Sequence, residues 1–541
     1  MKDFLPVIYP SIPWINQANN PFFEGDEPYM NIMPRPLNNQ TIGIHPRYEL
    51  ASAGNVPAAG TDRGRGVTSF SDQGGLFLDE DSYFYSGGSQ DLTATTGNGY
   101  AGNTGFNEEY TGSFVRHLVS GVENLVIVNA GHTSTNASAN HGNVWYVANG
   151  TSAPSSISDA VIPCNNGVSI TRGGASLDGY FIVCDITGKI YNSALNDITT
   201  WTATNFITAE REPDTGVFLG QHHNHIVYIG TRSIEFFYNA GNTSGSPLAR
   251  RADVQYSIGC YVPNSIVQDG DVIYFVGTDH AGWSKLYKLE NFQLVILVDD
   301  MPKGIDGRRP VPTKFNIASL DSLEHKMWLS YMEYGETPGL MLTYDYLWTY
   351  YWDSVTGLIF RFALDDTVTH VGGITAAQNW NNIYPIMSYN YDPALPRYQL
   401  INGRTLGLIG TGDNDTLDDW GTANNPEIWL TFPRWNADTD MKKRINWVRL
   451  ISHGAASDST KTDPFSVGIR WYDYDRKASD GPTPPGDYTT ARNIDANLAG
   501  AKLGRQGTTR ERQYLLDFKG LGHGPIGFIK GLEIDYEIVG Q

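Results

Sequence analysis

The chain has few cysteines and none of the common hydrolase signatures. Its 541 residues include three cysteines, Cys164, Cys184 and Cys260. An odd, sparse set without CxxC spacing argues against a disulfide framework and a cysteine-ligated zinc site. Cys184 and Cys260 lie in apolar runs, so we expect small core residues in a protein that assembles in a reducing cytoplasm. The absence of P-loop, G-x-S-x-G and H-E-x-x-H motifs removes the commonest hydrolase classes.

Long apolar runs and helical periodicity are missing too. No segment approaches the ~20 apolar residues of a membrane helix. Pro6, Pro10 and Pro13 interrupt the apolar start, which lacks the hydrophobic core and cleavage site of a signal peptide. Amphipathic helices of ~12 or more residues are not evident. These absences predict an all-β protein without a membrane segment.

An excess of positive charge is the third absence. The formal net charge is −20 and the isoelectric point is about 4.9. A protein that grips nucleic acid through phosphates normally shows a basic surface. The favoured interpretation is that a negative surface serves solubility; the acidity does not exclude a pore through which DNA slides without being held.

Turn-forming and aromatic residues are abundant instead. The chain has 58 Gly and 28 Pro, and aromatics make up 12%, which suits many short strands joined by tight turns. Strand-like units such as NLVIVNAG, GYFIVCDITGKIYNS and HIVYIG recur every roughly 40 to 60 residues, a period typical of propellers. The pattern predicts a β-propeller of about six blades, within a range of five to seven.

Composition divides the chain into three parts. Residues 1–62 contain many Pro and Asn and predict an extended N-terminal arm. Residues 63–425 carry the repeated units of the propeller. The Asp-rich stretch GTGDNDTLDDWGTANN then precedes residues 426–541, where alternating strands such as KKRINWVRLIS and FSVGIRWYDYD predict a C-terminal β-sandwich-like domain.

Several polar clusters could carry chemistry, but simpler interpretations are favoured. Glycosidase chemistry needs two carboxyls ~5–10 Å apart, and adjacent acids in turns are usually solvated. His223 and His225 would share a strand face and could bind a metal, and DNDTLDD offers oxygen ligands for calcium. The sequence therefore predicts no catalytic, cofactor-binding or metal-binding residue. The residues weighed are Asp79, Asp81, Asp299, Asp300, Asp365, Asp366, His222, His223, His225, Asp413, Asp415, Asp418 and Asp419.

The stretch from Ser233 to Leu289 carries a specific series of motifs. An S-x-E-aromatic strand precedes an N-A-G turn, a Pro and Arg segment and Ile-Gly-Cys. A strand, two aspartates around a glycine and a G-x-D-x-x-G turn follow. This series resembles the packaged-DNA stabilisation family, the tail nozzle proteins of short-tailed bacteriophages. The motif residues are Glu235, Gly241, Gly259, Asp271, Tyr274, Phe275, Gly277, Gly282 and Trp283.

Weaker resemblances extend to the C-terminus, where KKRINWVRL and LGRQGTTRERQYLLDF match the family's pattern in outline. The Gly- and Asn-rich segment 86–112 departs from it. The resemblance implies a structural virion protein that is not an enzyme and needs no cofactor. It implies a homo-hexameric ring in the tail, below the portal and the adaptor, that extends the DNA channel and retains the genome.

The implied partners are the adaptor, tail fibres, tailspikes or tip proteins, and double-stranded DNA that passes through the lumen without sequence-specific binding. Arg250 and Arg251 lie inside the best-matched stretch and are candidates for a contact between subunits. Two other classes stay open: a propeller glycoside hydrolase or carbohydrate-binding tail protein, and an adhesive virion surface protein. Cleavage of host polysaccharide by the purified chain would separate the enzyme from a nozzle.

Overall fold

In the residues that it describes, the computed structural model is built from strands, with short 3-10 turns at Pro163–Asn166 (η2) and Pro263–Ser265 (η3). No helix among the described residues is long and apolar enough to cross a membrane. The structure describes residues 1–6, 29–30, 32–38, 41–46, 50–55, 64–69, 75–79, 84–87, 93–94, 112–131, 141–148, 155–278, 284–299, 327–334, 337–344, 348–354, 359–362, 386–392, 397–402, 405–409, 429–432, 435–453, 466–474, 489, 492–495, 502–517 and 528–540.

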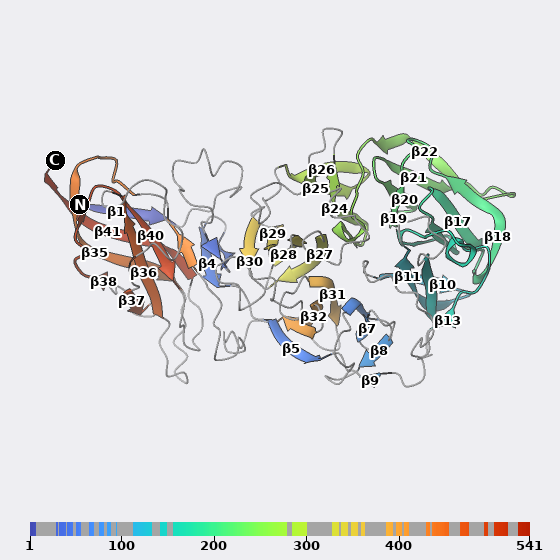
Figure 1. Cartoon of the computed structure of the whole chain (residues 1–541), viewed down its shortest axis with the longest axis horizontal. Coiled ribbons are helices and arrows are strands. Elements are labelled where there is room, and N and C mark those ends of the chain that lie inside the picture. The colour runs from blue at the N-terminus through green and yellow to red at the C-terminus, as the bar shows by residue number, and fades with distance from the viewer. Residues whose placement is uncertain are drawn as a thin grey trace.

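Seven antiparallel sheets of four or five strands follow one another along the chain, and we number them blades 1 to 7 (Figure 1). Blades 1 to 3 are β6 (Gly64–Ser69), β7 (Gly75–Asp79), β8 (Phe84–Gly87) and β9 (Thr93–Ala94); β10 (Ser113–Val119), β11 (Val122–Ala130), β12 (Gly142–Ala148) and β13 (Ser155–Ser156); and β15 (Ala175–Leu177), β16 (Tyr180–Cys184), β17 (Lys189–Ala194) and β18 (Asp197–Thr208).

Blade 4 has a fifth strand, which pairs in parallel with the blade's first antiparallel strand. Blades 4 and 5 are β14 (Arg172–Gly173), β19 (Gly216–His222), β20 (His225–Gly230), β21 (Ile234–Asn239) and β22 (Leu248–Tyr256); and β23 (Ile266–Asp269), β24 (Val272–Thr278), β25 (Ser284–Glu290) and β26 (Gln293–Val298). Blades 6 and 7 are β27 (Met327–Tyr334), β28 (Thr337–Tyr344), β29 (Trp348–Asp353) and β30 (Ile359–Phe362); and β31 (Ile386–Asp392), β32 (Arg397–Asn402), β33 (Thr405–Ile409) and β5 (Leu50–Asn55).

The first strands of neighbouring blades lie against one another in the described part of the chain. β10 contacts β15, β23 contacts β27, and β31 contacts both β27 and β6. The last blade is completed by β5 from the N-terminal part, which pairs with β33 from Leu50 opposite Ile409 to Asn55 opposite Thr405. Figure 1 shows β5 beside β32, far from the N-terminus itself.

The predicted all-β propeller class is confirmed. The described residues form seven blade sheets, one more than the favoured count of six. Two strands explain the difference. β5 comes from the segment interpreted as an arm and is the outer strand of blade 7, and β30 is the outer strand of blade 6. Sequence spacing alone shows neither pairing.

The central blade strands β16, β20 and β24 are buried on both faces. On β24, Ile273 and Phe275 pack against blade 4. Their neighbours Tyr274 and Val276 pack against blade 6. The strands β16 and β20 show the same alternation. Phe181 and Val183 on β16, and Ile226 and Tyr228 on β20, pack against the preceding blade. Ile182 and Cys184 on β16, and Val227 and Ile229 on β20, pack against the following blade. Double burial explains why these strands are continuous apolar runs, and Cys184 and Cys260 lie in this core as expected.

Two further sheets form a separate group of strands at the opposite end of Figure 1. The seven-stranded sheet has β3 (Ile32–Asn38), β4 (Thr41–Pro46), β41 (Phe528–Gly540), β35 (Lys442–His453) and β38 (Lys502–Leu503), with β1 (Lys2–Pro6) on β41 and β39 (Thr508–Thr509) on β35. The five-stranded sheet has β2 (Tyr29–Met30), β34 (Trp429–Thr431), β40 (Arg512–Asp517), β36 (Ser466–Asp473) and β37 (Arg492–Asp495).

Both of these sheets bury apolar side chains, which is what a sandwich requires. Ile445 and Ile534 are fully buried on the first sheet, and Ile469 and Leu516 on the second. Residues 1–62 contribute strands to both sheets and to blade 7, so this part of the chain joins the propeller to the C-terminal sheets. The boundaries at 62 and 425 stay predictions.

Removal of the Phe275 ring tests the double-faced packing. The ring is fully buried and stacks on Tyr287, with ring centroids 5.4 Å apart. We expect Phe275→Ala to lower the free energy of unfolding by ~3–5 kcal/mol, measured by urea denaturation. Val295→Ala, on an exposed position of the same blade, is the control and should change it by less than ~0.5 kcal/mol. Equal effects of the two changes would show that β24 is not core.

Candidate functional site at the blade junctions

The motif glutamate holds the edge of blade 4 together. Glu235 on β21 is 1% exposed, and its carboxylate accepts the backbone N–H of Arg211 at 2.9 Å. Arg250 on β22 places its Nε 2.8 Å from the other carboxylate oxygen and donates to Thr208 O at 2.9 Å. Burial raises the pKa of Glu235, which the Arg211 N–H and Arg250 partly oppose. The group therefore ties β21 and β22 to the segment that leads from blade 3.

The motif glycines lie where the backbone turns or where other groups come close. Gly241 has a φ of +68° in the turn after β21. A Cβ on Gly259 would lie 2.2 Å from the carbonyl carbon of Thr231, and one on Gly277 would lie 2.7 Å from the Tyr287 ring. Real Cβ atoms do not approach so closely, so the Gly259 and Gly277 positions require glycine for packing.

Asp271 and the three histidines meet at the contact between blades 4 and 5. His222 ends β19, His225 begins β20, and His223 lies in the turn between them. Asp271, in the turn before β24, accepts the backbone N–H of His223 at 2.9 Å and lies 3.1 Å from His223 Nδ1. The hairpin of one blade is thus bonded to the hairpin of the next.

The ring of His222 is fixed as one neutral tautomer. Its Nδ1 donates to the backbone carbonyl of Asp271 at 2.6 Å, and its Nε2 accepts the N–H of Phe292 at 2.9 Å. Burial lowers the pKa of His222. The Phe292 ring lies edge-on to His222 and under the Arg251 guanidinium, 4.7 and 4.2 Å away. With both ring nitrogens engaged, this histidine locks the blade contact.

The remaining residues singled out in the sequence differ in their burial and in their partners. Tyr274 is buried and stacks on Tyr331 at 5.5 Å. Arg251 pairs with Asp253 at 3.0 Å, so both motif arginines have partners within the chain, and their role between subunits stays a prediction. Asp299 is exposed and pairs with Lys285, and Asp79 ends β7. Gly282, Trp283, Asp81, Asp300, Asp365, Asp366, Asp413, Asp415, Asp418 and Asp419 lie outside the described residues.

No group of three or more His, Cys, Asp or Glu side chains in the described part of the chain could hold a metal ion. The turn that carries the three histidines is a polar contact between blades 4 and 5. The ring of His225 has different surroundings from the ring of His222. His225 lies 4.9 Å from the Phe292 ring and 3.5 Å from Arg251 Nη1. Burial, followed by the Arg251 charge, lowers the pKa of His225.

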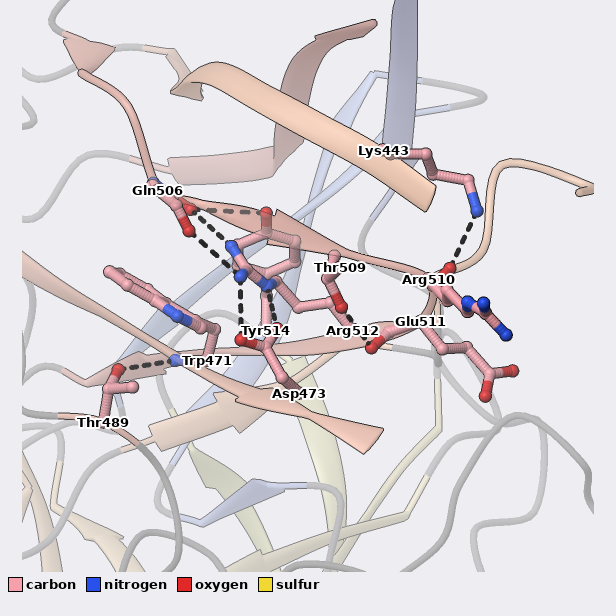
Figure 2. Close-up of polar contacts among 10 residues, drawn as sticks. All are labelled: Lys443, Trp471, Asp473, Thr489, Gln506, Thr509, Arg510, Glu511, Arg512 and Tyr514. Atoms are coloured by element: carbon pink, nitrogen blue, oxygen red, sulfur yellow. Dashed lines mark hydrogen bonds and ion pairs between the residues drawn. The ribbon is translucent and has the colours of Figure 1, made fainter. Parts of the chain in front are cut away.

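A buried ion pair in the C-terminal sheets was missed by the sequence analysis. Arg512 on β40 is fully buried, and its Nε and Nη2 lie 2.5 and 3.0 Å from the two oxygens of Asp473 on β36. Gln506 accepts further bonds through its backbone and side-chain oxygens. Figure 2 shows the guanidinium enclosed by these groups, with Trp471 and Tyr514 alongside. The available signal in the sequence is an arginine at the start of RQYLLD, shortly before the apolar residues Tyr514–Leu516.

A second buried cation fastens the neighbouring turn. Lys443 on β35 is fully buried, and its ammonium donates to the carbonyls of Met441 at 2.9 Å and Arg510 at 2.7 Å, and also to that of Thr439. Figure 2 shows Lys443 reaching toward Arg510, two residues before Arg512. The start of β35 is therefore fixed to the strand that carries the Arg512 pair.

Comparison with protein families finds one match, to the blade region. Residues 115–294 match the model of a family described as bacteriophage P22 Gp10, β-propeller. The matched residues run from β10 to β26, that is, through blades 2 to 5 and all the junctions described above. The match spans less than half of the chain. It supports a phage structural protein that contains a propeller. No curated protein matches the chain.

Solved structures show only distant likeness. The WD40 domain of Neurospora crassa Pan2 aligns at 11% identity, covering 68% of this chain and 97% of that one, with a TM-score of 0.38. The extracellular domain of BT4673 from B. thetaiotaomicron aligns at 12% identity, covering 71% and 46%, with a TM-score of 0.37. Both scores are low, and neither likeness carries further argument.

Loss of the neutral His222 contact should appear as a pH-dependent stability. The unfolded histidine has a pKa near ~6.5, and the folded value is lower. Below pH ~6.5 the His222 side chain is protonated in the unfolded chain but stays neutral in the folded chain. The free energy of unfolding therefore falls as the pH decreases. We expect the melting temperature to drop between pH ~7.5 and ~5.5, with a shallower slope for His222→Asn. His223→Asn, which keeps His222, is the control; equal slopes in His222→Asn and wild type would contradict the assignment.

Separation of the Arg512 pair tests the C-terminal cluster. Asp473→Asn leaves a buried guanidinium without a carboxylate, which should lower the free energy of unfolding by ~3–5 kcal/mol. Adding Arg512→Met should recover part of this loss, since the uncompensated charge is gone. The control is Arg444→Met, which breaks an exposed pair with Glu537 and should cost less than ~1 kcal/mol. Urea unfolding followed by tryptophan fluorescence measures all three, and a cost for Asp473→Asn as small as the control's would contradict the role.

Proposed function

We propose that the protein is the tail nozzle of a short-tailed bacteriophage. In this role the chain forms a ring below the adaptor, extends the DNA channel and retains the packaged genome by completing a closed tube. It anchors fibres, spikes or tip proteins in the virion tail. The observation that supports this most directly is the P22 Gp10 family match over residues 115–294, which coincides with blades 2 to 5.

The physical character of the chain agrees with a structural role. The net charge of −20 opposes adhesion to DNA phosphates, so DNA would slide past instead of being gripped. Glu235, Asp271 and His222 at the matched junctions are engaged in bonds that fix neighbouring strands. Groups engaged in this way hold position, as a ring component needs, and we propose that the chain catalyses no reaction.

Genome retention is the test of this proposal. Particles assembled without the chain should package DNA but lose it on incubation, measured as genome content per particle over time. Particles that carry Val295→Ala, an exposed position, should stay full. Mass measurement of isolated tails should give about six copies in a closed ring. A monomeric or trimeric component, or stable infectious particles without the chain, would overturn the proposal, and cleavage of host polysaccharide by the purified chain would favour the hydrolase.

A further inference from the structure

Arg172 lies where several blades meet near the ring's inner strands. It belongs to β14, the fifth strand of blade 4, which pairs with β19 through Arg172 opposite Phe218 and Gly173 opposite Leu219. β14 also contacts β10 and β11 of blade 2, and the N–H of Gly173 donates to Ser113 Oγ at 3.1 Å. The Arg172 side chain therefore begins at the edge of blade 4 where the first strands of neighbouring blades lie against one another.

Two glycines allow the short strand β14 to lie close to neighbouring blades. Gly173 has a φ of +89°, and a Cβ there would lie 2.0 Å from the carbonyl oxygen of Leu219. A Cβ on Gly174 would lie 3.1 Å from the Phe181 ring. The two glycines after Arg172 thus bring its backbone against blades 2 and 4 at once, and the long side chain reaches across to blade 5.

The guanidinium is only partly satisfied by the protein. Arg172 Nη1 donates to the carbonyls of Pro263 at 2.6 Å and Ile266 at 2.5 Å, at the entry to blade 5. Its Nε is buried and, within the described part of the chain, has no hydrogen-bond partner. Burial lowers the pKa of Arg172 to about 10. The residue as a whole keeps partial exposure.

Comparison with the other enclosed arginines shows what Arg172 lacks. Arg512 has the bidentate carboxylate of Asp473, and Arg250 has Glu235. Among the described residues no ion pair joins Arg172 to a carboxylate. A cation removed from water costs several kcal/mol unless an anion or a full set of acceptors compensates, and two carbonyls supply only part of that set for the five donors of a guanidinium.

We infer that Arg172 binds a small inorganic anion at the inner strands of the propeller. The anion sits against the free donor side of the guanidinium, opposite the carbonyls of Pro263 and Ile266, and supplies the missing negative charge. A halide or an oxyanion such as phosphate offers the same chemistry to a planar donor group. The bound anion links blades 2, 4 and 5, since β14, β10 and the entry to β23 all meet at this residue. The inference is independent of the proposed function.

The experiment titrates anions against the stability of the full chain. The purified protein is placed in a gluconate buffer, and chloride or inorganic phosphate is exchanged for gluconate at constant ionic strength. We expect the melting temperature to rise and then saturate, as binding to the folded state alone requires. Arg172→Gln should abolish this rise. Arg116→Gln is the control, because Arg116 is an exposed arginine of β10 paired with Glu123, and it should keep the rise.

A crystallographic measurement on the wild-type protein tests the inference even if Arg172→Gln fails to fold. In the wild-type protein prepared with bromide, anomalous scattering should place a bromide within hydrogen-bond distance of Arg172. Chloride and phosphate titrations of the same protein distinguish a halide site from an oxyanion site. Water alone beside the guanidinium, a melting temperature that does not respond to either anion, or an unchanged response in Arg172→Gln would each overturn the inference.

Discussion

Burial of the central blade strands β16, β20 and β24 on both faces is the constraint on which the described structure depends. A blade cannot cover its own apolar surface, because Ile273 and Phe275 face one neighbour while Tyr274 faces the other. Each blade is therefore stabilised by the blades on either side of it. Blade 7, whose outer strand β5 pairs with β33, contacts β6 of blade 1 through its first strand β31. Stability thus comes from contacts between neighbouring blades, as in other repeat architectures.

Apolar packing between blades is strong but not directional, so polar contacts have to set the relative position of neighbours. Volume-conserving changes are tolerated in cores, whereas the Asp271 carboxylate and the His222 ring bond to one partner hairpin in one geometry. The same division holds in the C-terminal sheets. Ile469 and Leu516 contribute buried apolar surface, and the Arg512–Asp473 ion pair joins β40 to β36. We propose that these contacts contribute register more than net stability.

How much the sequence predicts follows from this division. Apolar runs such as VIYFVG report local burial, so β24, β25 and the all-β class could be predicted. Pairing between distant strands leaves no local signal, and the roles of β5 in blade 7 and β1 beside β41 were not foreseen. Glu235 was singled out by its motif, but its partner Arg250 was assigned to a subunit contact. Arg172 stands in the run TRGGAS, whose composition is that of a loop and gives no sign of the strand that pairs with β19.

The polar groups at the junctions are largely occupied by bonds within the chain. A catalytic acid or base must exchange protons, and it therefore needs a free or weakly held site at the reacting atom. His222 has a donor on one ring nitrogen and an acceptor on the other, and Asp185 accepts from Thr187, Lys189 and Tyr191. Such groups resist exchange and stiffen the contacts around them. Arg172 differs from His222 and Asp185 because its buried Nε has no hydrogen-bond partner in the described part of the chain, and this open donor is the one to which we assign an anion.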